Sequence, residues 1–280
     1  MKRICYLLSS LMLVFFINTT SVAQTNYNQL TVNGISAIGI ENMVLTDAVG
    51  TDNKIQHSAS FDIKLTDNSA IKNVIAALQN AVPKTNLKSR EVSSSNMQMV
   101  FVTYNNNLVI TEQKFYTGIT VDEIKLPDLN ASDKSIAKIS VKLRATTANT
   151  VSLGGKATNP GFARVNNVMV SNFKAAIGTL PCTRVMKISG TSATPVGSPE
   201  QNFTIELAGT DGAQWNQWFT SGAGGAKKEQ GTIELLSANF STALFTIQLT
   251  DISIVSYSVV NAGTTTKAVV GLRARVVAVK

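Results

Sequence analysis

The segment Phe61-Asp62-Ile63-Lys64-Leu65 alternates apolar with charged side chains, and Phe203-Thr204-Ile205-Glu206-Leu207 repeats its Phe-x-Ile-x-Leu pattern. A period of two is typical of a β-strand that buries one face. The same alternation returns in further stretches rich in threonine, valine and isoleucine: Ile136–Arg144, Leu244–Leu249, Ile252–Val260 and Leu272–Val279. These residues favour pleated, half-buried strands. The sequence therefore predicts a mainly β protein.

Helical spacing is clear in two places, and each follows one of the two Phe-x-Ile-x-Leu segments. Ser69–Leu78 places its apolar residues on one helical face, after Asp67-Asn68-Ser69, which can cap the helix. Asp211–Phe219 does the same with Trp215 and Trp218, and a glycine-rich stretch ends it. We expect one helix after each of the two strands.

The order of elements is repeated after each helix. A strand, an asparagine-containing turn and three further strands follow, and Ala137–Ala145 matches Ala268–Val276 as the closing strand. A repeated succession of elements indicates two copies of one unit. The predicted organisation is a first β-barrel domain at 24–146, a linker at 147–161 rich in small and turn-forming residues, and a second β-barrel domain at 162–280. Within the second domain, Ser189–Gln201 is expected to form an exposed hairpin or flap.

The amino-terminal residues predict export. Lys2 and Arg3 precede an apolar run, Ile4–Ile17, that is shorter than a usual membrane span, and Ser21-Val22-Ala23 ends in small residues at a cleavage site. We therefore expect residues 1–23 to be a signal peptide and the mature protein to start at Gln24. The expected location is the periplasm, the cell surface or the medium, with no stable membrane span after cleavage.

Composition excludes several classes of site. Of the 280 residues, 44% are hydrophobic and 15% charged, and His57, Cys5 and Cys182 are the only histidine and cysteines. Clustered zinc ligands, iron–sulfur ligation and a disulfide framework are therefore excluded. Without Lys2 and Arg3, 23 basic residues face 17 acidic ones, and they are spread along the chain, which argues against a nucleic-acid partner.

The residues offer no complete catalytic set, and we expect no catalytic residue, cofactor or metal site. His57 lies in a polar stretch, and Cys182 is expected to be a buried, inert thiol. The neighbours Asp122 and Glu123 should point to opposite faces of a strand. The stretch Gly222–Gly225 follows a helix, whereas a phosphate-binding loop precedes one.

The second half resembles the tail-tube proteins of contractile phage tails and the haemolysin-coregulated tube protein of type VI secretion. The residues that carry the resemblance are Glu206-Leu207, Trp215 and Trp218, Lys227-Lys228, the strand Gly231–Leu236, Phe245–Leu249 with Ile252–Val260, and the final strand rich in valine, leucine and arginine. It extends more weakly to Phe61–Ala145. That family folds as a small barrel with one flanking helix and stacks as rings, commonly without a secretory signal.

The resemblance implies an exported, non-enzymatic structural subunit that forms homo-oligomers. Two domains per chain would make a trimer equivalent to a ring of six domains. Lys138, Ser140 and Lys142 would then face a solvated lumen or outer surface. The alternative is a secreted surface binding module or adhesin for a glycan or protein, in which Trp215 and Trp218 contact the ligand instead of packing on the barrel.

Overall fold

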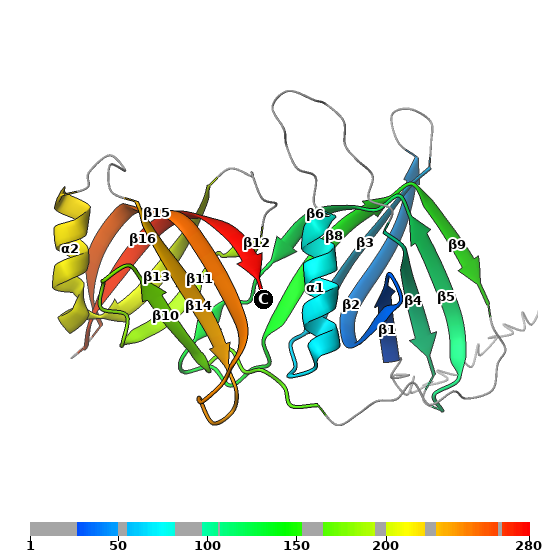
Figure 1. Ribbon diagram of the computed structural model, residues 1–280, viewed down its shortest axis with the longest axis horizontal. Helices are drawn as coiled ribbons and strands as arrows, with labels where there is room; N and C mark the ends of the chain where they lie inside the picture. The colour runs from blue at the N-terminus through cyan, green and yellow to red at the C-terminus, as the bar shows by residue number, and fades with distance from the viewer. Residues whose placement is uncertain are drawn as a thin grey trace, which may run out of the picture.

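The computed structural model describes residues 27–49, 55–81, 97–105, 107–152, 165–193, 200–221, 228–262 and 265–280. The predicted signal peptide and its cleavage site lie outside this part of the chain. The fold is mainly β, as predicted, and consists of two curled sheets of nine and seven strands (Figure 1). The two sheets correspond largely to the first and second halves of the sequence.

The first sheet is curled, and the chain connects strands near its two ends. Its order is β12-β6-β8-β3-β2-β1-β4-β5-β9. Only Thr146 separates β8 from β9, and β6 pairs with β8 as β5 pairs with β9. The two ends of the sheet are therefore held by the same continuous stretch of chain. The strands of the first half are β1 (Tyr27–Val32), β2 (Ile35–Val49), β3 (Ile55–Lys64), β4 (Met99–Tyr104), β5 (Ile110–Thr117), β6 (Thr120–Lys125), β7 (Leu129–Asn130), β8 (Lys138–Ala145) and β9 (Thr147–Val151).

The second sheet follows the same succession but stays open at one place. Its order is β10-β14-β15-β16-β13-β11-β7. The long strand β15 takes the places of both β5 and β6. Strands β10 and β11 are equivalent to β1 and β2, but they are not paired with each other. Its strands are β10 (Phe173–Ile177), β11 (Val185–Ser189), β13 (Gln201–Ala208), β14 (Glu229–Leu236), β15 (Ala243–Ala262) and β16 (Thr265–Val279); the short β12 (Ser192–Ala193) joins the first sheet.

The registers of the two halves also correspond. In the first half Phe61 pairs with Val141, and in the second half Phe203 pairs with Leu272. The pair Ile63 and Ile139 likewise matches Ile205 and Val270. The sequence match of Ala137–Ala145 with Ala268–Val276 predicts these equivalences. The two-domain organisation remains a prediction, which the common register supports.

Each helix follows the strand predicted to precede it. Helix α1 (Ser69–Asn80) is capped by the Asn68 side chain, which accepts a hydrogen bond from the Ala70 amide, and it buries Ile71, Val74, Ile75 and Leu78. A short 3₁₀ helix, η1 (Gly209–Asp211), leads into α2 (Gly212–Ser221), which buries Trp215 and Trp218. Both helices thus bury the apolar faces that their spacing predicts.

Short segments cross between the halves. The second half donates β12 to β6, and the first half donates β7 to β11. Isolated bridges join Thr66 to Asn167 and Ile136 to Met169, and buried residues of both halves form one hydrophobic cluster. The segment 147–161, predicted as a linker, begins with β9, which pairs with β5; residues 153–161 lie outside the described part of the chain. Packing and strand exchange therefore join the halves.

Candidate functional site

The two tryptophans of α2 are buried. Trp215 has no exposed surface, and its indole nitrogen donates a hydrogen bond to the Pro181 carbonyl at 3.0 Å. Trp218 is 4% exposed, and its ring lies 6.1 Å from that of Trp215. Neither ring offers an open face to a ligand in this conformation, so the arrangement agrees with packing on the sheet rather than with a sugar platform.

An ion pair between the exposed Arg184 and the buried Asp211 lies just before α2. Arg184 donates to Asp211 Oδ1 at 2.5 Å, and Asp211 is 6% exposed. Its other oxygen, Oδ2, is buried and has no hydrogen-bond partner among the described residues. The pair joins the segment before β11 to the helix.

The thiol of Cys182 lies close to this pair and is poorly suited to nucleophilic chemistry. Burial raises its pKa and is the largest effect; a hydrogen bond to the Ile177 backbone lowers the pKa by less, and the charge of Asp211 adds a still smaller rise. The thiolate is the nucleophilic form of cysteine, and a raised pKa reduces its population. The raised pKa agrees with the inert thiol predicted from the sequence, but Cys182 is only partly buried, so the prediction of a buried side chain is wrong.

Asp122 and Glu123 lie over the same face of the sheet, so the expectation of opposite faces is wrong. The β6–β8 register shifts between Val121 and Glu123, which marks a bulge. Arg144 forms a two-pronged pair with Asp122, and Lys142 lies 2.8 Å from Glu123. A bulge adds one residue to a strand and reverses the alternation beyond it. Each carboxylate is paired with its own cation rather than with the other carboxylate.

Ion pairs and hydrogen bonds cover this outward face of the first sheet. Lys138 lies 2.7 Å from Glu41, which also pairs with Lys64, and Ser140 donates to Asp62. Lys138, Ser140 and Lys142 alternate along β8 with buried residues and stand on its exposed side. Among the described residues no group of three or more histidine, cysteine or acidic side chains could hold a metal ion.

His57 is the third residue of β3, close to the start of the strand. It stands opposite Asp47 in the β2–β3 pair, and its Nδ1 atom lies 2.7 Å from Asp47 Oδ1. The pair links the two strands near the end of their hairpin. The imidazole and the carboxylate thus form a cross-strand pair.

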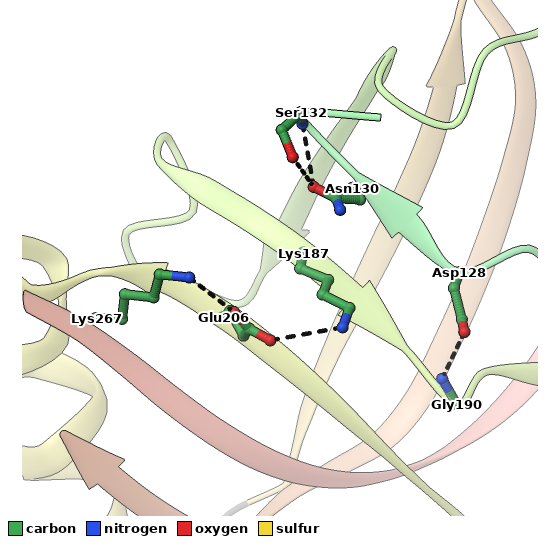
Figure 2. A network of polar contacts seen from close by, with 7 residues as sticks. All are labelled: Asp128, Asn130, Ser132, Lys187, Gly190, Glu206 and Lys267. Carbon is green, nitrogen blue, oxygen red and sulfur yellow. Dashed lines mark hydrogen bonds and ion pairs between the residues drawn. The ribbon is translucent and has the colours of Figure 1, made fainter. Parts of the chain in front are cut away.

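A polar hollow of about 660 Å³ lies where β7, from the first half of the chain, meets the strands of the second half. Figure 2 shows Glu206 between Lys187 and Lys267, at 3.8 and 3.5 Å, beside the turn that follows β7. In that turn Asn130 accepts hydrogen bonds from the Ser132 amide and hydroxyl. Nearby, the Gly190 amide donates to Asp128. Of these contacts, the one between Gly190 and Asp128 joins the two halves, together with the β7–β11 pairing and the bond from the Ala131 amide to the Met186 carbonyl.

The open place in the second sheet is a groove of about 430 Å³ along β10. Phe173 and Ala175 line one side, and Leu180, Cys182 and Val185 line the other. The Leu236 amide bonds to the Asn172 carbonyl, and the Gly178 amide bonds to the Gln230 carbonyl, so the even-numbered residues of β10 face β14. Because an antiparallel ladder alternates, the backbone groups of Phe173 and Ala175 face the groove.

Sequence patterns missed this groove because it depends on which strands pair. The segment 178–184 is longer than the two-residue turn that joins β1 to β2, which is the only local signal of the difference.

Among the described residues no helix is long and apolar enough to cross a membrane. Comparison with protein-family models and with curated proteins finds no match, so the resemblance to tail-tube proteins rests on residue patterns alone.

Proposed function

We propose that the chain is an exported, non-enzymatic structural subunit that resembles tail-tube proteins and assembles into rings or other homo-oligomers. The observation that carries this proposal is the joint between the halves. Two units with the same strand succession and register contact each other through unlike surfaces. One chain then corresponds to two consecutive members of a head-to-tail series.

The elements at the joint differ between the two halves. The first half contributes α1, β6 and β7, and the second half contributes β16, β12 and β11. Gln79 of α1 accepts a hydrogen bond from the Val279 amide, and the Lys72 ammonium lies 5.5 Å from the centre of the Phe245 ring. A contact between unlike surfaces can be repeated, and its repetition gives rings when the rotation closes.

The ionisable groups favour a structural role over an enzymatic one. Asp122, Glu123 and Glu41 pair with cations across strands, and the only buried acidic side chain among the described residues pairs with Arg184. A hydrolase needs a nucleophile and a base in hydrogen-bond contact. The charged groups of the first sheet instead connect its strands to one another.

The alternative function is a secreted surface binding module or adhesin, and the groove along β10 favours it. Extended peptides bind such edges by adding a strand, with backbone hydrogen bonds for affinity and side-chain pockets for specificity. The unpaired backbone of Phe173 and Ala175 offers this, and the seam already accepts β7 from the other half. The geometry suits a peptide ligand better than a glycan.

Light scattering coupled to size-exclusion chromatography, with negative-stain microscopy of residues 24–280, tests the proposal. We expect the mass of a trimer, or of a larger species, and ring-shaped particles at micromolar concentration. A monomer at every concentration tested would reject the structural-subunit proposal. Saturable binding of an extended peptide to that monomer, lost on substitution of residues lining the β10 groove, would then favour the binding module.

A further inference from the structure

Two long strands extend past their neighbours and leave unpaired edges. Beyond Ile40, β2 pairs only with β3, and beyond Ile252, β15 pairs only with β16, among the strands that the structure describes. Figure 1 shows the first edge on the β2–β3 hairpin and the second beside α2, in the other half of the molecule. Unpaired edges of this length are available to another chain unless something protects them.

Exposed apolar side chains concentrate at these two places. Six of the ten exposed large apolar residues in the described part of the chain lie there, which leaves only four for the rest of the surface. On the hairpin they are Val44, Val49 and Ile55, and on the far part of β15 they are Val255, Val259 and Val260. Val49 is 72% exposed and Val259 is 53% exposed. Clustered exposed apolar residues mark interaction surfaces.

The chain contains a precedent for joining these two kinds of edge. The far part of β15 is the counterpart of β6. In the first half β5 pairs with β4, and β6, which follows β5, pairs with β8. In the second half the near part of β15 pairs with β14, and the far part pairs only with β16 among the described strands. The edge of β6 that faces away from β8 pairs with β12 of the second half. In the sequence, β12 follows β11 and precedes β13, which are the counterparts of β2 and β3.

We propose that the β2 edge from Met43 to Val49 pairs with the β15 edge from Val255 to Val260 of a second copy. This contact repeats between chains the pairing that β12 and β6 make within one chain. The inference rests on the proposed structural-subunit function and names its interface. Because the two edges differ, each copy keeps one edge of each kind, and assembly proceeds head to tail.

Lysine substitution at each edge tests the pairing. Val259→Lys and Val49→Lys each place a charge among apolar side chains, and we expect the concentration for half-maximal assembly to rise at least about tenfold. Phe240→Lys is the matched control, because Phe240 is 58% exposed and lies in the β14–β15 turn, away from both edges. It should assemble as the wild type does. Circular dichroism melting of each variant verifies that it folds.

A charge-complementation experiment makes the test specific for the two edges. Val259→Glu alone should weaken assembly, and Val49→Lys in the same chain should restore much of it, because the glutamate of one copy then faces the lysine of the next. Assembly of every variant at the wild-type concentration would overturn this interface and leave the structural-subunit proposal intact. A wild-type protein that remains monomeric would overturn both.

Discussion

The two halves build the same succession of strands but differ at one strand pair among the described residues. In the first half β1 and β2 are joined by the two-residue turn Asn33-Gly34 and pair directly. In the second half residues 178–184 separate β10 from β11, and Trp215 holds Pro181 of that segment by a hydrogen bond. A longer connection, fixed by the helix, therefore leaves a seam where the other half has a strand pair.

The bend between β5 and β6 also differs from the corresponding bend within β15. In the first half Gly118 has a φ of +61° between β5 and β6, whereas in β15 the bend contains Asp251 with a φ of +54°. A Cβ atom at Gly118 would overlap the Thr146 side chain, but Asp251 has room for its side chain near Lys228 and Arg275. The same backbone conformation thus requires glycine in one half only.

The largest expected effect concerns the helix anchors. Trp215→Ala should lower the free energy of unfolding by about 4 kcal/mol, because it removes a fully buried ring and its bond to Pro181. Ile71→Ala, in the first helix, should cost about 3 kcal/mol. Urea unfolding followed by circular dichroism measures both, with the exposed Asn216→Ala as control. A change below about 1 kcal/mol for Trp215→Ala would contradict the packing role.

Substitution at the two bends sharpens the comparison of the halves. Gly118→Ala should destabilise by about 2 kcal/mol or more, because the left-handed backbone and the contact with Thr146 both oppose a Cβ atom. Asp251→Gly should change stability by less than about 1 kcal/mol, since relief of strain offsets the entropy of glycine and the loss of exposed ion pairs. Equal effects at both positions would show that the bends are not differently constrained.

The joint between the halves can be weakened at one hydrogen bond. Gln79→Ala removes the acceptor of the Val279 amide and should cost about 1 kcal/mol. Asn73→Ala, on the exposed side of the same helix, serves as control and should cost less than about 0.5 kcal/mol. Hydrogen exchange at the Val279 amide should quicken in the first variant alone. An unchanged exchange rate would show that this hydrogen bond does not stabilise the joint.

The smallest effect is a pH dependence in the first sheet. Burial raises the pKa of Glu41, but hydrogen bonds and charges of Lys138 and Lys64 lower it by more, so it lies below its ordinary value. A carboxyl group with a lowered folded pKa stabilises the fold above its unfolded pKa, and this contribution is lost as pH falls through the folded value. Glu41→Gln should therefore cost up to about 1 kcal/mol at pH 7 and little at pH 2. Urea midpoints at the two pH values measure the difference, and a cost that grows on acidification would contradict it.

Side-chain periodicity determined the mainly β fold, both helices and the register of equivalent strands. Burial of one face dictates alternation in a strand and three-to-four spacing in a helix. The burial of Phe61, Phe203 and Trp215 could therefore be predicted from the neighbouring residues alone. The opposite faces expected for Asp122 and Glu123 were wrong because a strict alternation was assumed across a bulge. The local signal was the pair of charged residues between the buried Val121 and Ile124, which breaks the period of two.

Only the tertiary structure decided how the halves meet and where the candidate surfaces lie. The exchange of β7 and β12, the seam beside β10 and the unpaired edges of β2 and β15 all depend on which strand lies next to which. Such pairings form between residues far apart in the chain, and strands with similar alternation can pair in many ways. Periodicity specifies which face of a strand is buried, and the competition among backbone edges in the folded chain selects its neighbour.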